Sequence, residues 1–142
     1  MLLEEKLFTQ RGNVLKIEFK YDKDFFADTT KFLEKGLSIK KMKSILQDIG
    51  DEGVDRLAEA TPMDTGMTAD SWTYEIEEYS DTELKLYFIN ENEVDGVNVA
   101  MLLQYGHGTR NGGYVPGDDF INPVLDELGE ELADAVAEEV EF

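Results

Sequence analysis

The segment TPMDTG at residues 61–66 marks a change of hydrophobic period in the chain. Before it, apolar residues recur every three to four positions, as in an amphipathic helix. After it, apolar and polar residues alternate, as in half-buried strands. Pro62 disfavours the α conformation at Thr61 and ends the helix, while Gly66 can adopt the positive φ of a tight turn into a strand. The segment therefore predicts a helix-to-strand junction, with Trp72 opening the strand.

The same segment permits a catalytic interpretation. Asp64-Thr65-Gly66 is the tripeptide that carries the catalytic carboxylate of aspartic proteases. Such a protease needs an apolar strand before the Asp and two carboxylates that share a proton, whereas Pro62 resists strand pairing here. Asp64 and Thr65 can instead hydrogen-bond the local backbone and hold the turn in one shape. We expect a structural turn, and an aspartic protease is the alternative.

Two long amphipathic patterns predict helices. From Ile39 to Ala58 the apolar residues form one stripe, which indicates a helix about 30 Å long. Gly50 and Gly53 each weaken this helix by about 1 kcal/mol relative to Ala, which favours a bend there. The second helix starts around residues 119–123 and presents an apolar stripe opposite an acidic face.

The start of the C-terminal helix has several candidate caps. Asn122 can cap the helix with Pro123 at the first helical position, and Asp118 or Asp119 can cap it one turn earlier. The pattern leaves these alternatives open.

Alternation predicts a small antiparallel sheet. Residues 13–21 form one strand, and residues 72–77 and 84–89 form a hairpin whose inner face packs on the long helix. On the outer face of the hairpin, Tyr87 and Ile89 are more apolar than a solvated surface requires. They indicate a subunit contact or a third layer.

These elements predict one α+β domain over residues 1–142, in which the small antiparallel sheet packs against the long central helix and the C-terminal helix. A short helix is expected over residues 24–35. Residues 1–12 form either a short strand or a mobile arm, and residues 97–105 form either a short helix or a buried strand. The sequence does not decide between them.

Composition narrows the class of function. The net charge is −19, from 32 acidic and 13 basic residues, and argues against an ordinary nucleic-acid-binding surface. The chain has no Cys and a single His, so we expect no metal site and no cofactor. No apolar run approaches membrane-spanning length, and the N-terminus does not look like a secretion signal. We therefore expect a soluble protein without a membrane partner.

Residues 105–118 are expected to form a glycine-rich loop, with five glycines in the first thirteen positions. The loop lacks the Lys-Ser/Thr ending of a phosphate-binding loop. His107 could pair with Asp118 or Asp119 for acid–base or metal chemistry, but a solvated loop histidine is the simpler expectation. Arg110 is the only Arg after Arg56. It is a candidate to pair with a neighbouring subunit's carboxylates or to touch phosphate.

Several motifs occur in the order known from one protein family. They are the turn at residues 61–66, Ser71-Trp72, the LQYG segment at residues 103–106 with its Gly-Thr-Arg loop, and residues 116–123 leading into a terminal helix. Over residues 14–140 the chain resembles the neck or tail-completion components of siphovirus-type tailed phages. The family often has Arg or Lys directly after Asp-Thr-Gly, where this chain has Met67.

The resemblance implies a non-enzymatic virion protein that forms a ring at the head–tail junction. Its partners would be further copies of itself, the head connector and a tail-tube or tail-terminator protein, and genome DNA would pass through the lumen without specific binding. It would be found in the virion neck and, during assembly, in the host cytoplasm. A soluble protein-binding adaptor is a further alternative. The candidate subunit-interface residues are Tyr87, Ile89, Tyr105, Gly106, His107, Thr109, Arg110 and Tyr114.

Overall fold

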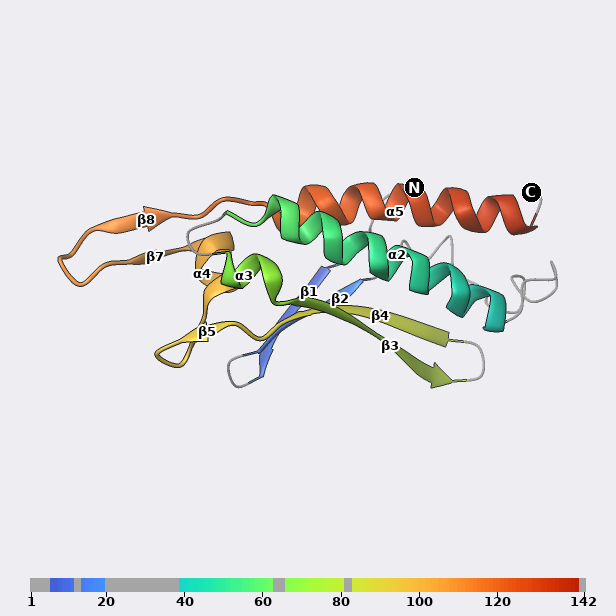
Figure 1. Cartoon of the computed structure of the whole chain (residues 1–142), viewed down its shortest axis with the longest axis horizontal. Coiled ribbons are helices and arrows are strands. Elements are labelled where there is room, and N and C mark those ends of the chain that lie inside the picture. Colours follow the sequence, from blue (N-terminus) through green and yellow to red (C-terminus); the bar gives the residue numbers. More distant parts are fainter. Residues whose placement is uncertain (1–5, 12–13, 20–38, 63–65, 81–82, 141–142) are drawn as a thin grey trace.

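The computed structural model describes residues 6–11, 14–19, 39–62, 66–80 and 83–140. Figure 1 shows two long helices lying over one face of a sheet, with smaller elements at one end. In chain order the elements are β1 (Lys6–Arg11), β2 (Val14–Phe19), α2 (Ile39–Ala60), α3 (Met67–Asp70), β3 (Trp72–Ser80), β4 (Glu83–Asn90), β5 (Glu93–Val94), β6 (Val97–Asn98), α4 (Val99–Tyr105), β7 (Gly106–Gly108), β8 (Tyr114–Pro116) and α5 (Ile121–Val140).

The main sheet is antiparallel and four-stranded, in the order β1-β2-β4-β3. In its register Phe88 of β4 lies opposite Ile17 of β2 and Tyr74 of β3. Its side chain is fully buried and reaches the helices, because alternate residues of a strand point to the same face. The core of the domain is formed by Leu15, Ile17, Ile45, Leu46, Ile49, Leu57, Trp72, Leu86, Phe88, Ala100, Phe120, Ile121, Val124, Leu125, Leu128, Leu132 and Val136.

Two buried glycines of α2 allow the helix to approach the sheet closely. A Cβ atom on Gly50 would lie 2.4 Å from Cδ2 of Tyr74, and one on Gly53 would lie 2.4 Å from Cζ of Phe88. Both glycines lie within one uninterrupted helix. Their role in this fold is to make room for aromatic rings.

The predicted α+β class is confirmed, with an antiparallel sheet, a long helix and a C-terminal helix. Lys6–Arg11 forms a strand paired with β2, so the alternative of a mobile N-terminal segment is wrong for these residues. Residues 97–105 are mostly helical, because only Val97–Asn98 pair as a strand before α4 begins. The helix expected over residues 24–35 lies outside the described residues. None of the helices in the described part of the chain is long and apolar enough to cross a membrane.

Candidate functional site

The turn after α2 is held by a buried pair of side chains. The hydroxyl of Thr61 donates to the carbonyl of Leu57 over 2.6 Å and accepts from Nε1 of Trp72 over 2.9 Å. Thr61 and Trp72 are both buried, so this contact satisfies the only polar atom of the indole ring in the core. The structure thus brings together two of the residues that the sequence singled out.

The rest of the turn differs partly from its prediction. Gly66 has the expected positive φ of 82°, but it precedes the short helix α3 and does not lead directly into a strand. Pro62 is half-buried beside Thr61. Asp64 and Thr65 lie outside the described residues, so the protease interpretation rests on the sequence alone.

A buried polar network, which was hardly predictable from the sequence, organises the end of the molecule near α3. Asn90 donates through Nδ2 to the carbonyl of Thr68 over 2.9 Å, and Asn98 donates through Nδ2 to the carbonyl of Asn90 over 2.8 Å. Oδ1 of Asn98 accepts from the backbone N–H of Met101 and caps α4. The network joins β4, α3 and α4. Only the capping position of Asn98 before an apolar run offered a sequence signal.

A second buried polar contact joins α4 to the start of α5. Gln104 donates through Nε2 to Oδ1 of Asp119 over 2.7 Å, and its Oε1 accepts from the backbone N–H of Ile121 over 3.2 Å. Oδ1 of Asp119 also accepts from the backbone N–H of Asn122. The side chain of Asp119 therefore caps α5, which agrees with the earlier of the two predicted caps.

A glycine-rich loop was expected over residues 105–118. Within this range, residues 106–117 contain a β-hairpin that we call the arm. Gly106 pairs with Pro116, and Gly108 pairs with Tyr114. At the tip, the backbone N–H of Thr109 donates to the carbonyl of Gly113 over 2.9 Å. Figure 1 shows the arm projecting beyond the end of the helices. The sequence did not reveal it because two three-residue strands rich in Gly carry no clear alternation.

The base of the arm is closely packed backbone. Gly106 has a φ of 82°, and a Cβ atom there would lie 2.6 Å from the backbone nitrogen of Gly117. A Cβ atom on Gly117 would lie 2.5 Å from the carbonyl oxygen of Gln104. The hydroxyl of Tyr114 donates to the carbonyl of Tyr105 over 3.1 Å. Glycine is therefore required where the arm leaves the body.

The arm and its base at the end of α4 expose large apolar side chains. Tyr105 is 51% exposed, Tyr114 is 66% exposed and Val115 is 44% exposed. Thr109 and Arg110 at the tip are exposed as well, and Arg110 has no ion pair within the described part of the chain. His107 is only half-buried overall, yet its Nδ1 is buried without a hydrogen-bond partner among the described residues.

The other predicted interface residues are less accessible. Tyr87 and Ile89 are half-buried on β4, which lies between β2 and β3 in the sheet. Nζ of Lys16 lies 4.1 Å from the centroid of the Tyr87 ring, which is a cation–π contact within the chain. The ring of Tyr87 thus contacts a side chain of its own sheet. The arm is more exposed than Tyr87 and Ile89 are.

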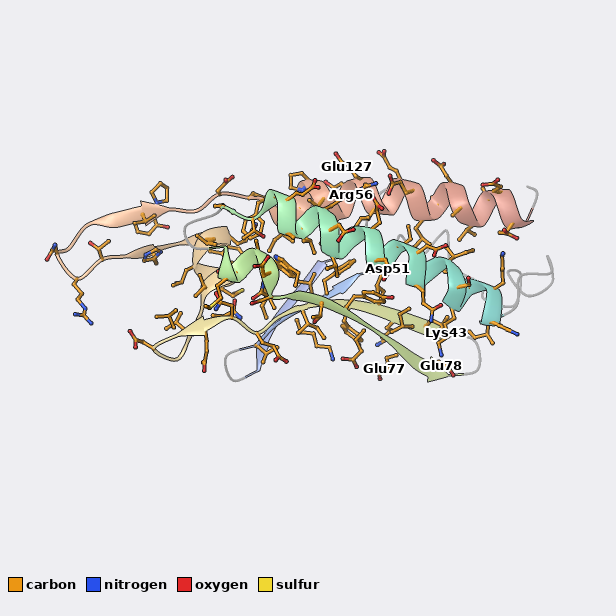
Figure 2. All side chains as sticks on the ribbon, in the orientation of Figure 1. Lys43, Asp51, Arg56, Glu77, Glu78 and Glu127 are labelled. Carbon is orange, nitrogen blue, oxygen red and sulfur yellow. The ribbon has the colours of Figure 1, made fainter. Side chains whose placement is uncertain are left out.

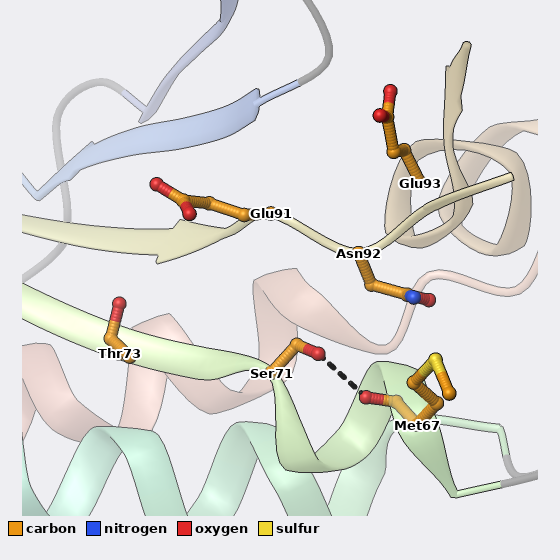
Figure 3. Close-up of a pocket in the computed structure, with 6 residues that line it drawn as sticks. All are labelled: Met67, Ser71, Thr73, Glu91, Asn92 and Glu93. Carbon is orange, nitrogen blue, oxygen red and sulfur yellow. Dashed lines mark hydrogen bonds between the residues drawn. The ribbon is translucent and has the colours of Figure 1, made fainter.

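An open depression of about 410 Å³ lies at the same end of the molecule as the arm (Figure 1, Figure 3). Glu91 and Glu93 are exposed at this depression and form no ion pair with any described residue. Met67 is 61% exposed beside them. The depression is lined by Met67, Ser71, Thr73, Glu91, Asn92 and Glu93.

Two cations of α2, Arg56 and Lys43, form ion pairs with other parts of the body. Arg56 on α2 lies 2.6 Å from Glu131 and 3.6 Å from Glu127, both on α5, and also contacts Glu52 (Figure 2). The hydrogen bond to Glu131 raises the pKa of Arg56, against the opposing effect of burial. Lys43 on α2 contacts Glu78 on β3 over 2.9 Å. Within the described ranges, no three His, Asp or Glu side chains gather in a way that could hold a metal ion.

Comparison of the chain with protein-family models, with curated proteins and with solved structures finds no match.

Proposed function

We propose that this chain is a non-enzymatic structural subunit of a tailed virion, which forms a ring at the head–tail junction and joins the connector to the tail tube or its terminator. The observation that carries the proposal is the arm, a two-stranded hairpin that projects from the body with Tyr114 and Val115 exposed. An isolated two-stranded hairpin is at best marginally stable in water, so packing against a neighbour would stabilise it.

The arrangement of the chain suits repetition around an axis. In a ring of identical subunits, each interface joins one surface of a copy to a different surface of the next copy. The projecting arm supplies one of the two different surfaces that such an interface needs. In the assembled particle, we propose that part of the acidic surface lines the passage for DNA, because a net charge of −19 per copy would repel phosphate and let DNA pass without specific binding.

The experiment that tests the proposal measures the molar mass of the purified protein by light scattering, at low and high salt, alone and with neck fractions of tailed particles. We expect a ring-sized species, visible as rings by electron microscopy. Salt should favour it, because screening weakens the repulsion between acidic copies at distances beyond about 10 Å. A lumen that proves basic or neutral in the ring would contradict the proposed passage.

A deletion of residues 111–114 tests the role of the arm. The body should remain folded by circular dichroism, while ring formation and particle completion are lost. The exposed Glu130→Ala on α5 serves as a surface control and should assemble normally. Normal assembly of the deletion variant would remove the main support for the proposal.

A strict monomer that never joins the neck would instead favour an adaptor or an aspartic protease. Asp64→Asn separates these two. A protease would lose all activity, whereas a structural turn would lose only about 1 kcal/mol of stability.

A further inference from the structure

The arm carries one positive charge, with exposed apolar side chains close to it in the sequence. Arg110 is the only Lys or Arg after Lys85, and it lies at the exposed tip. Tyr114 and Val115 follow on β8, and both are exposed. An arginine side chain combines an apolar stem with a planar, permanently charged guanidinium, so it suits a surface that offers both apolar contact and carboxylates.

The depression beside α3 offers such a surface. Figure 3 shows Glu91 and Glu93 on the segment that follows β4, and Met67 on α3 below them. Met67 supplies the exposed apolar side chain of this surface, at 61% exposure. The floor is fixed, because Oδ1 of Asn92 accepts from the hydroxyl of Thr68 over 2.6 Å and Ser71 donates to the carbonyl of Met67 over 2.7 Å.

We infer that the arm of one copy of this chain docks in the depression of a second copy, with Arg110 bound by Glu91 and Glu93 and with an apolar side chain of β8 against Met67. This inference rests on the proposed function, in that it identifies the two surfaces that meet in the ring. Carboxylates with no cation among the described residues of their own chain receive a cation that has no carboxylate in the described part of its own chain.

A second copy fits these surfaces better than a nucleic acid does. Phosphate would have to approach Arg110 past a chain that carries 32 acidic residues, whereas an identical chain offers the exposed carboxylates of Glu91 and Glu93 to the same cation. Copies with a net charge of −19 repel each other at long range, and this repulsion is screened by salt more than a close ion pair is. Association should therefore strengthen from low to moderate salt.

Charge reversal tests the contact in the full-length protein. Arg110→Glu, and separately the pair Glu91→Lys with Glu93→Lys, should each weaken self-association by about tenfold or more. Mixing the two variants should restore association, because each negative arm then meets a positive depression and each unchanged arm meets unchanged carboxylates. The matched controls are Lys40→Glu, and Glu75→Lys with Glu77→Lys, which make comparable charge changes at exposed positions outside both surfaces.

A cross-link distinguishes a ring from a closed dimer. The chain has no cysteine, so Arg110→Cys combined with Glu93→Cys in one chain introduces the only two thiols. In a ring each copy is linked to two different neighbours, so mild oxidation should give a ladder of covalent species larger than a dimer. Arg110→Cys with Glu75→Cys is the control and should give no ladder.

The outcomes separate the inference from the proposed function. If the protein forms rings but the charge reversals behave like their controls, the inference is overturned and the proposed function stands. If cross-linking stops at a dimer while mixing restores association, the two surfaces do meet but the ring proposal fails. If the wild-type protein stays monomeric at every salt concentration and does not join neck fractions, both are overturned.

Discussion

The body of the molecule buries its apolar side chains, whereas the arm leaves its side chains exposed. In the body, α2 packs against both the sheet and α5, and side chains such as Phe88 and Leu125 are fully buried. In the arm, every residue from 108 to 117 is exposed. The body is thus stabilised by contacts within the chain, since burying a large apolar side chain contributes roughly 1.5–3 kcal/mol. The arm lacks such burial, and under the proposed function it would be stabilised by contact with a second copy.

Glycine shows the same contrast at the level of single residues. In the body, Gly53 lies in a helix where the ring of Phe88 leaves no room for a Cβ atom. In the arm, Gly112 has a φ of 79° and open space around the position of a Cβ atom. The first glycine serves packing between two elements, and the second serves a turn. A glycine therefore has to be interpreted from its neighbours before a role is assigned to it.

The largest expected effect compares one aromatic residue from each region. Phe88→Ala should lower the free energy of unfolding by about 3–5 kcal/mol, because it leaves a cavity between the sheet and the helices. Tyr114→Ala should change it by less than about 0.5 kcal/mol, since the side chain is mostly exposed. Urea denaturation followed by circular dichroism measures both values. If Tyr114→Ala proved as damaging as Phe88→Ala, the arm would belong to the cooperative core.

A smaller effect is expected from the buried polar contact at the turn. Thr61→Val keeps the volume of the side chain but leaves Nε1 of Trp72 without its acceptor, which should cost about 1–3 kcal/mol. Thr61→Ser retains the hydroxyl and should cost less, and Trp fluorescence reports the surroundings of the ring directly. A negligible loss in Thr61→Val together with a large loss in Thr61→Ser would show that the methyl group matters and the hydrogen bond does not.

The two kinds of glycine give the next comparison. Gly53→Ala should overpack against Phe88 at a cost of about 1–3 kcal/mol, partly offset by about 1 kcal/mol of helix propensity. Gly112→Ala should strain only the positive-φ turn, at about 1 kcal/mol of local energy. Thermal denaturation should detect the first change, and hydrogen exchange in the arm should detect the second. A lower global melting temperature for Gly112→Ala would contradict the separation of arm and body.

These contrasts also explain how far sequence could predict the structure. The sheet and both long helices were predictable, because burial against one core forces periods of two and about 3.6 on the apolar residues. The buried hydrogen bonds of Asn90 and Asn98 were not predictable, because an Asn in a sequence indicates a loop until its hydrogen-bond partners are known. Exposure at Tyr87 was overestimated because its contact with Lys16 comes from another strand.

For the candidate site, individual residues were easier to single out from the sequence than the surfaces to which they belong. Arg110 stood out as the only Arg after Arg56, and Tyr105 and Tyr114 were named through the family resemblance. The structure places all three in or at the base of the arm. The depression beside α3 was missed, because its lining comes from α3, β3, β5 and the segments that flank them, which only the fold brings together. No local pattern in the sequence marks a surface of this kind.

The smallest expected effect concerns pH. Burial, followed by a hydrogen bond to Asp51 and the charges of Asp51 and Asp48, raises the pKa of Tyr74 above its usual value of 10.0. A raised pKa in the folded state means that the unfolded chain loses its proton first. The stabilisation from Tyr74 is therefore fully present below pH 10.0 and is lost as pH rises through the folded-state pKa.

Tyr74→Phe tests the titration of Tyr74, and Tyr105→Phe at the base of the arm provides the comparison. The pKa of Tyr105 is also raised, chiefly by burial and then by the charge of Asp119, but its side chain is half exposed and its contribution is screened by solvent. The free energy of unfolding, measured by urea denaturation from neutral pH to above pH 10.0, should fall less steeply in Tyr74→Phe than in the wild type. Tyr105→Phe should change the slope less. A larger change in Tyr105→Phe would mean that the base of the arm unfolds together with the body, and the division between arm and body would have to be placed further along the hairpin.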